Sequence, residues 1–202
     1  MRKKVGVLVS GRGSNLQALL DACADPAFPA EITLVISNVP GVYALERAAQ
    51  AGVPSLVISH KGFASREAFD AEMDKALRAA GIEIVCLAGF MRLLSTGFAE
   101  SWRGRMINIH PALLPSFKGL HTHRRAIEAG VKLHGCTVHL VTPELDDGPI
   151  LVQKAVPVLA SDDEDSLAAR VLEQEHKAYP EALRLLAEGR VTVEGNCALI
   201  RD

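Results

Sequence analysis

Two polar side chains, Asn108 and His110, stand two positions apart in the apolar run Ile-Asn-Ile-His. Because side chains alternate between the faces of a β-strand, a strand over this run would place both on one face. Pro111 follows at once and lacks a backbone donor, so we expect the strand to end there. A buried amide and imidazole at a strand end cost stability unless they bind something. The amide can donate to a developing oxyanion and the imidazole can move a proton near neutral pH, which indicates an acyl-transfer site.

A carboxylate that could support the imidazole lies in Leu-Asp-Asp-Gly-Pro, residues 145–149. This turn follows another expected strand, and we expect it to lie at the same edge of the sheet as His110. A carboxylate beside the imidazole would raise the pKa of the ring and keep it a proton donor. Each feature alone has a simpler interpretation, as a surface turn or a satisfied histidine at a strand end. Their combination favours catalysis.

A glycine-rich turn, Ser-Gly-Arg-Gly-Ser-Asn at 10–15, separates an expected strand from an expected helix. Glycines there allow the backbone to approach an anion, and the N–H groups of the helix start point toward it. Leu16 replaces the third glycine of a dinucleotide motif and no P-loop lysine follows, so a monophosphate fits better than NAD or a nucleoside triphosphate. The alternative is an ordinary glycine turn with Ser14 as helix N-cap.

Two further segments have open interpretations. His121 and His123, with His134 and His139 nearby, could chelate a metal, but no Cys or Glu completes a recognisable ligand set, so no metal is expected. The segment 89–94, Gly-Phe-Met-Arg-Leu-Leu, could be core packing or the wall of an apolar cleft for a flat ligand.

Composition limits the class of protein. The 202 residues include 49% hydrophobic ones, enough for one substantial core. With 22 Lys and Arg against 24 Asp and Glu, the net charge of −2 argues against a nucleic-acid partner. The first apolar run ends at Ser10, too early for a signal peptide or a membrane span. The 4 cysteines are scattered without a C-x-x-C pair, so we expect a reducing, cytoplasmic location.

Strands and helices alternate along the chain, which predicts an α/β protein with a Rossmann-like, mostly parallel sheet and helices on both faces. We see no linker or repeat, so residues 1–202 are expected to form one domain. The expected strands are 5–10, 32–36, 55–58, 82–88, 106–110, 131–141 and 150–158, with a terminal hairpin of 191–193 and 198–200. The expected helices are 15–24, 44–51, 66–80, 95–101 and 165–187, and 111–123 is expected to be a loop.

Five motifs together resemble the phosphoribosylglycinamide formyltransferase (glycinamide ribonucleotide transformylase) family of folate-dependent formyltransferases. They are Ser-Gly-Arg-Gly-Ser-Asn-Leu-Gln (10–17), Leu-Ala-Gly-Phe-Met-Arg-Leu-Leu-Ser (87–95), Asn-Ile-His-Pro-Ala-Leu-Leu-Pro (108–115), Gly-Leu-His-Thr-His (119–123) and Glu-Leu-Asp-Asp-Gly-Pro (144–149). The resemblance covers nearly the whole chain in order. Asn-x-His with a distant Asp is shared by the wider formyltransferases, whereas the first and fourth motifs point to the glycinamide ribonucleotide branch.

The resemblance implies a reaction and its catalytic residues. The amine of 5'-phosphoribosylglycinamide would attack the formyl group of 10-formyltetrahydrofolate, a co-substrate, in purine (IMP) synthesis. By position, Asn108 would hold the oxyanion and His110 would donate a proton, assisted by Asp146. The resemblance implies small-molecule partners and is compatible with a homodimer, a state that the sequence does not itself determine.

The same resemblance implies two binding sites. The ribonucleotide would be bound in the N-terminal part by Gly13, Ser14 and Asn15, with Glu175 from the last long helix. The folate would lie mainly in the C-terminal part, bordered by Arg66, Met91, Arg92, Leu93, Leu94, Val141, Thr142, Pro143 and Glu144.

The chain departs from the family pattern at Arg12 and Asp147, where small neutral residues are common. Asp147 would add a negative charge beside the catalytic carboxylate and could shift the pH optimum. Three other readings stay open: formyltetrahydrofolate deformylase, methionyl-tRNA formyltransferase and a non-catalytic nucleotide-binding module. The second would need a tRNA-binding domain and the first an N-terminal regulatory domain, and we expect neither here.

Overall fold

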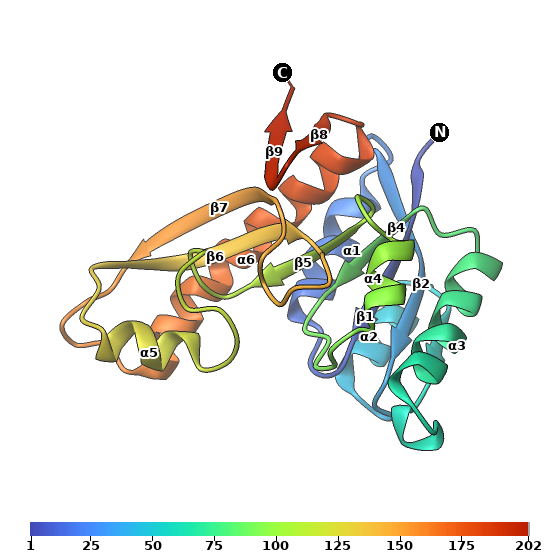
Figure 1. Cartoon of the computed structure of the whole chain (residues 1–202), viewed down its shortest axis with the longest axis horizontal. Helices are drawn as coiled ribbons and strands as arrows, with labels where there is room; N and C mark the ends of the chain where they lie inside the picture. The colour runs from blue at the N-terminus through green and yellow to red at the C-terminus, as the bar shows by residue number, and fades with distance from the viewer. Residues whose placement is uncertain (202) are drawn as a thin grey trace.

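A seven-stranded sheet forms the centre of the protein, whose computed structural model describes residues 1–201 (Figure 1). Its strand order is β3-β2-β1-β4-β5-β6-β7. The five strands from β3 to β5 run parallel, whereas β6 is antiparallel to both of its neighbours. The strands are β1 (Lys3–Val9), β2 (Ala30–Ser37), β3 (Ser55–Val57), β4 (Ile84–Leu87), β5 (Met106–His110), β6 (Leu133–Leu140) and β7 (Ile150–Pro157). The mostly parallel, Rossmann-like sheet predicted from the sequence is confirmed.

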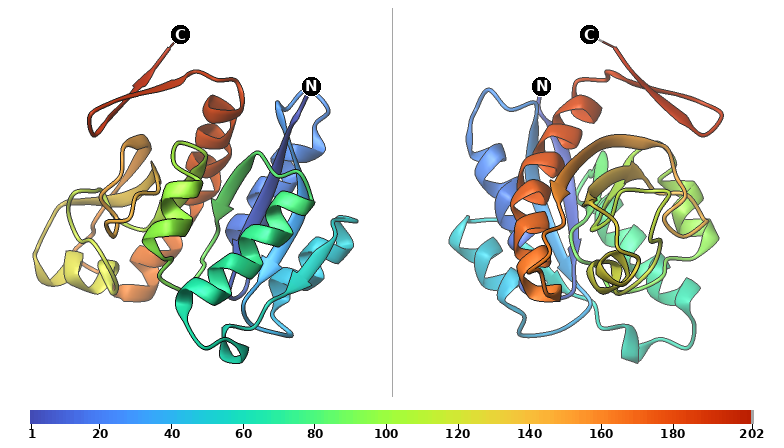
Figure 2. Two further views of the ribbon diagram at one scale, coloured as in Figure 1. Left: turned by 45° about the vertical axis from the view of Figure 1, so that its right-hand side comes forward. Right: turned by 90° about the vertical axis from the view of Figure 1, so that its left-hand side faces the viewer.

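Helices cover both faces of this sheet, as expected from the alternation of strands and helices (Figure 2). One hydrophobic core lies between the sheet and α1, α2 and α6, and includes Leu16, Ala44 and Tyr179. The other lies between the sheet and α3 and α4, and includes Phe69 and Trp102. The helices are α1 (Ser14–Ala24), α2 (Tyr43–Gln50), α3 (Arg66–Ala79), α4 (Thr96–Ser101), α5 (Thr122–Glu128) and α6 (Glu164–Ala187), with a 3₁₀ turn at His60–Gly62.

The strand order reverses direction between β1 and β4, which are adjacent in the sheet. In open α/β sheets, ligands bind beside the carboxyl ends of the strands at such a point. The glycine-rich turn follows β1, the segment 89–94 follows β4, and His110 ends β5. Three of the segments singled out in the sequence therefore meet at one edge of the sheet.

Two local features differ from the expectations. Helix α5 begins at Thr122, inside the segment expected to be a loop, and the Thr122 hydroxyl donates to the carbonyl of Pro111 at 2.7 Å. Helix α1 begins at Ser14 and its N-cap is Gly13, with no side-chain capping bond, so the interpretation of Ser14 as N-cap is wrong. Gly13 adopts the left-handed conformation that a side chain disfavours, which the sequence pattern did not specify.

A two-stranded hairpin, β8 (Val191–Glu194) and β9 (Cys197–Ile200), follows α6. Its turn reaches back to the loop between β6 and β7, where Asn196 Nδ2 donates to the carbonyl of Asp147 at 3.0 Å. Among the residues described, no helix is both long and apolar enough to cross a membrane.

Candidate active site

Strand β5 presents Asn108 and His110 on the face of the sheet that also carries Met106. His110 is buried and Asn108 is half-buried. His110 Nε2 donates to the carbonyl of Phe117 at 3.0 Å, so this nitrogen carries a hydrogen. The strand ends at His110, as predicted from Pro111.

Asp146 lies against His110 from a distant part of the chain. Its Oδ2 is 3.4 Å from His110 Nδ1, and both side chains are buried, with exposed fractions of 7% and 6%. The same oxygen accepts a hydrogen bond from the backbone N–H of Gly119 at 3.0 Å. Both ring nitrogens of His110 therefore face oxygen acceptors, which hold the ring in one orientation and suit it to proton transfer.

The route by which Asp146 reaches His110 differs from the expected one. Because β6 is antiparallel to β5, its carboxyl end points to the opposite edge of the sheet, where Leu140 pairs with Ile107. The loop 141–149 then folds back over the face that carries the two polar side chains of β5. Asp146 adopts a left-handed conformation with φ of 50° within this loop. The expectation of a turn at the same sheet edge is therefore wrong, although the two side chains do meet.

His139 on β6 lies beside both Asn108 and Asp146. It pairs with Asn108 in the strand register, and its Nε2 lies 3.3 Å from Asn108 Nδ2 and 3.8 Å from Asp146 Oδ1. Burial lowers the pKa of His139, so the ring is neutral, and its Nδ1 donates to the carbonyl of Leu140 at 2.9 Å. Nε2 is then the acceptor for the Asn108 amide. This contact orients the amide and leaves its second N–H free for another acceptor.

Asp147, the neighbour of Asp146, points elsewhere. Its carboxylate forms an ion pair with Lys118, and the Asp147 side chain is exposed whereas that of Lys118 is half-buried. The two carboxylates of the Asp-Asp pair therefore have different environments, one buried against imidazole and one paired with an ammonium group at the surface. The charge that the sequence led us to place beside Asp146 is compensated by Lys118.

The segment after β5 is joined to β6 and β7 by side-chain hydrogen bonds. Thr137 Oγ1 donates to the carbonyl of Ala112 at 2.7 Å and accepts from the N–H of Leu114 at 3.0 Å. Gln153 Nε2 reaches the same hydroxyl and the carbonyl of Leu114, each at 2.9 Å. These contacts hold the chain that leads from His110 to Phe117, whose carbonyl binds the imidazole.

The glycine-rich turn lies at the start of α1. Gly13 has φ of 73°, and a Cβ there would lie 2.7 Å from Ala44 Cβ, so only glycine fits. Asn15 Nδ2 donates to Glu175 Oε2 at 2.7 Å, which joins two expected ribonucleotide residues 160 positions apart in the chain. Burial raises the pKa of Glu175, and the bond from Asn15 partly opposes this shift.

The residues expected to border a folate are all exposed or half-buried. Met91 and Leu93 are exposed, with exposed fractions of 68% and 57%, so they do not belong to the core. The N–H of Met91 donates to Ser10 Oγ at 2.8 Å, which brings this segment beside the glycine-rich turn. Arg66 is exposed at the first position of α3, and within residues 1–201 no hydrogen bond or ion pair joins it to the segment 91–94.

The remaining folate positions are Arg92, Leu94 and the segment 141–144. Arg92 is exposed, and Leu94 is half-buried against the core under α3 and α4. Val141 packs on that same core, and its N–H donates to the carbonyl of Met106 at 2.9 Å. Thr142 and Pro143 are half-buried and Glu144 is exposed, all on the loop that carries Asp146.

The histidines considered as metal ligands are arranged differently. His123 and His134 meet edge to face, with ring centroids 5.2 Å apart, and burial lowers the pKa of His134 to about 4. His121 is exposed at the N-cap of α5. The described chain contains no group of three or more His, Cys, Asp or Glu side chains that could hold a metal ion.

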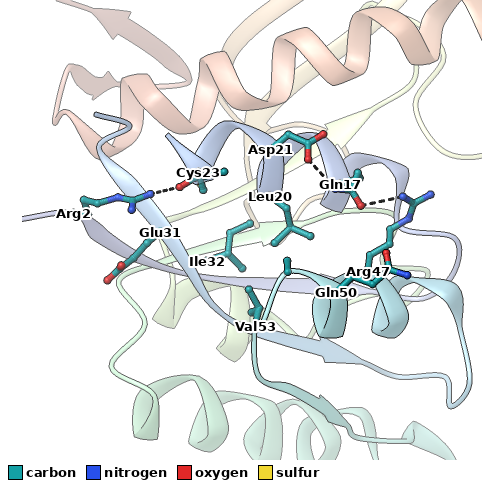
Figure 3. A pocket seen from close by; sticks show the side chains of 12 residues that line it. Arg2, Gln17, Leu20, Asp21, Cys23, Glu31, Ile32, Arg47, Gln50 and Val53 are labelled. Carbon is teal, nitrogen blue, oxygen red and sulfur yellow. Dashed lines mark hydrogen bonds between the residues drawn. The ribbon is translucent and has the colours of Figure 1, made fainter. Parts of the chain in front are cut away.

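One of two cavities borders these groups, and the other lies apart from them. A cavity of about 280 Å³ is bordered by Asp146, Asp147 and the hairpin residues Asn196 and Cys197. A larger one, of about 470 Å³, lies among α1, α2 and the start of β2 and includes none of the expected site residues (Figure 3).

No motif of the sequence assigns a function to Phe117 or Lys118, and the sequence indicates His139 only as a potential metal ligand. Alternation along its strand could have placed it on one face, but its partner Asn108 follows from the β5–β6 register, which the sequence does not determine. The contribution of Phe117 is a backbone carbonyl, which no side-chain pattern reveals.

A family model and individual relatives of known description point to the same protein family. The family model described as "Formyl transferase" matches residues 3–183. The "Phosphoribosylglycinamide formyltransferase" of Escherichia coli (strain K12) is 47% identical over 192 residues, which cover 95% of this chain and 91% of that protein. The "Trifunctional purine biosynthetic protein adenosine-3" of Drosophila melanogaster is 57% identical over 194 residues, 95% of this chain. The chain spans only 14% of the length of that relative.

Solved structures show the same fold. The crystal structure of glycinamide ribonucleotide transformylase 1 from Symbiobacterium toebii matches with a TM-score of 0.97 and 48% identity, over 100% of this chain and 95% of that one. A formyltetrahydrofolate deformylase from Pseudomonas syringae matches with a TM-score of 0.93 and 29% identity, over 100% of this chain and 67% of that one. The fold is therefore shared by proteins described with two different activities.

Proposed function

The chain belongs to the formyl transferase family, and on this premise we propose that it transfers a formyl group from 10-formyltetrahydrofolate to the amine of 5'-phosphoribosylglycinamide. The products are N-formyl-phosphoribosylglycinamide and tetrahydrofolate, a step of purine synthesis. The proposal depends chiefly on the buried contact between His110 Nδ1 and Asp146 Oδ2, 3.4 Å apart, beside the oriented amide of Asn108. It is supported by relatives of similar length that are described as phosphoribosylglycinamide formyltransferases.

In the proposed reaction the amine nitrogen of the substrate forms a bond to the formyl carbon of the folate. The formyl oxygen becomes an oxyanion, and the free N–H of Asn108 donates to it. Such a donor is worth about a hundred- to a thousandfold in rate. The intermediate collapses as the bond from carbon to N10 breaks, the attacking nitrogen loses a proton, and N10 gains one.

His110 is the proposed proton carrier for this exchange. Its Nδ1 faces the buried carboxylate of Asp146, which orients the ring. Its Nε2 binds the carbonyl of Phe117 in the structure, so this hydrogen bond must be exchanged for one to the reacting groups. A positioned acid or base of this kind contributes about a hundred- to a ten-thousandfold in rate.

We propose that the two substrates bind on either side of these residues. The backbone of Gly13, Ser14 and Asn15 would bind the ribose phosphate, and Glu175 would contact the ribose side. The folate would be bordered by the following residues: Arg66, Met91, Arg92, Leu93, Leu94, Val141, Thr142, Pro143 and Glu144. Support comes from the bond between Asn15 and Glu175, which joins two of the ribonucleotide positions, and from that between Met91 and Ser10, which joins the folate segment to the glycine-rich turn.

The wider context of the reaction is also proposed. Residues 1–202 would act as one catalytic domain, in the cytoplasm, on small-molecule partners alone, and a homodimer stays a prediction. Three of the four cysteines are buried and all are free, which is compatible with a reducing compartment.

The experiment that tests the function is an absorbance assay of folate deformylation with and without phosphoribosylglycinamide. Turnover that requires the amine supports the transferase. Turnover without it would mean that the chain is a deformylase, the activity of a structural neighbour of the same fold. Absence of turnover under both conditions would indicate a non-catalytic nucleotide-binding module and would refute the proposed function.

A further inference from the structure

The side chain of Arg47 on α2 contacts the glycine-rich turn on the side that faces α1 and α2. Its Nε donates to the backbone carbonyl of Arg12 at 2.9 Å, and its Nη1 donates to the side-chain oxygen of Gln17 on α1 at 3.0 Å. Figure 3 shows the guanidinium of Arg47 directed toward Gln17 across the space between α1 and α2. The residue therefore joins the turn and two helices through one planar group.

The guanidinium is held in place before any ligand binds. It lies over the ring of Tyr43, with the central carbon 4.6 Å from the ring centroid. Gln17 is itself oriented, because its Nε2 donates to Asp21 Oδ1 at 2.8 Å. A planar donor with fixed neighbours loses little freedom when it forms its hydrogen bonds, so the contact with Arg12 is well defined.

Three successive carbonyls of the turn are bound in this way. The carbonyl of Gly11 accepts from the N–H of Ala44 at 3.1 Å, that of Arg12 accepts from Arg47, and that of Gly13 accepts from the N–H of Gln17 at 2.9 Å. In a trans peptide the C=O and the following N–H point in opposite directions. Binding the carbonyls toward α1 and α2 therefore turns the N–H groups of residues 12–14 away from these helices.

From this geometry we propose that Arg47 is a positioning residue for the phosphate of the substrate. Arg47 does not touch the phosphate. It holds the peptide between Arg12 and Gly13 so that the N–H of Gly13 faces the anion, together with the N–H groups of Ser14 and Asn15, which have no partner within the helix. The inference rests on the proposed function, because it deepens the role of the ribonucleotide site.

A purely structural role for Arg47, as a link between α1 and α2, makes a different prediction. Loss of such a link would weaken the fold and affect every substrate alike. Loss of a positioning contact would affect only substrates that carry the phosphate. Kinetics with the phosphorylated substrate and with its dephosphorylated analogue, the glycinamide ribonucleoside, separate the two roles.

The test compares Arg47→Ala, Arg47→Lys and the control Arg78→Ala. Arg78 is an exposed arginine on α3 that pairs with Asp74, away from the turn. We expect Arg47→Ala to raise KM for phosphoribosylglycinamide about tenfold to a hundredfold, the scale of a lost charge-assisted hydrogen bond. Turnover at saturation, KM for the folate and kinetics with the ribonucleoside should stay unchanged. Lysine keeps one donor and should recover part of the loss, and Arg78→Ala should match the unsubstituted protein.

A loss that is equal for both substrates, or no loss at all, would overturn the proposal. Titration with inorganic phosphate, followed by calorimetry, keeps the inference testable if phosphoribosylglycinamide is not a substrate. Weaker phosphate binding in Arg47→Ala than in Arg78→Ala would then support the positioning role even though the proposed function had failed. Equal binding in the two variants, or no phosphate binding to the unsubstituted chain, would overturn it.

Discussion

Replacing Asp146 by Asn should lower turnover far more than replacing Asp147 by Asn, although the two are neighbours. Asp146 lies 3.4 Å from His110 Nδ1 in a buried pair, whereas Asp147 is exposed and pairs with Lys118. Asn keeps the shape of the side chain and can still accept the bond from the Gly119 N–H. The substitution therefore removes a charge with little change in packing.

The expected magnitudes follow from the two environments. Asp146→Asn leaves Nδ1 of His110 without the carboxylate that lies 3.4 Å from it, and a general acid that is poorly oriented loses much of its contribution of about a hundred- to a ten-thousandfold. The asparagine oxygen can still orient the ring in part, so we expect a loss of about a hundred- to a thousandfold in kcat. An exposed ion pair is worth about 0–1 kcal/mol, so Asp147→Asn should cost less than about fivefold.

The assay is amine-dependent tetrahydrofolate formation measured across pH. In Asp146→Asn, turnover should be low across the whole pH range, because the imidazole has lost the carboxylate that orients its Nδ1. The profile of Asp147→Asn should move little and less still at high salt. Combining Asp146→Asn with His110→Ala should add little to the loss from His110→Ala alone, since residues that act as one unit are not additive. Equal losses in the two single variants, or a larger loss at Asp147, would refute this assignment of the carboxylates.

Three further predictions concern the neighbouring groups. Asn108→Ala and His110→Ala should each reduce turnover at least about a hundredfold while the protein stays folded, and retention of more than about a tenth of the activity would contradict their roles. Gly13→Ala should weaken phosphate binding and destabilise the fold, because its Cβ would lie 2.7 Å from that of Ala44; calorimetry and a thermal melt will check both effects. Glu175→Gln should increase the free energy of unfolding at pH 7 while weakening ribonucleotide binding. Burial raises the folded pKa of Glu175 above its ordinary value of 4.5, so this group costs stability as pH rises through the folded pKa. Urea titrations should show the advantage of Glu175→Gln shrinking as pH falls and vanishing below about 4.5, and a constant difference would contradict the prediction.

Much of the fold was predictable because local patterns determine it. The alternation of apolar runs with helical spacing predicted the strands and most helices to within a few residues, and β5 at its observed bounds. Helix α5 was missed because its seven residues carry little apolar periodicity, and a tertiary bond from Thr122 to Pro111 supports its start. The reversed direction of β6 is also not encoded in any short pattern, because it depends on how the loops return the chain.

For the candidate site, the amino-acid sequence by itself determined which residues are candidates for the chemistry. Asn108 and His110 share a face because strand side chains alternate, and a glycine-rich turn before a helix indicates an anion site wherever it occurs. Those statements depend only on neighbours in the chain. They hold before any long-range contact forms.

Only the tertiary structure decided which distant groups meet. It selected Asp146 rather than Asp147 for His110, brought His139 to the amide of Asn108, joined Asn15 to Glu175, and bound the carbonyl of Arg12 to Arg47. Each of these contacts depends on strand register, loop path or helix packing. Such features are set by the burial of the whole core rather than by the residues on either side of the contact, because a single register slip or an altered loop would separate the same side chains by several ångströms.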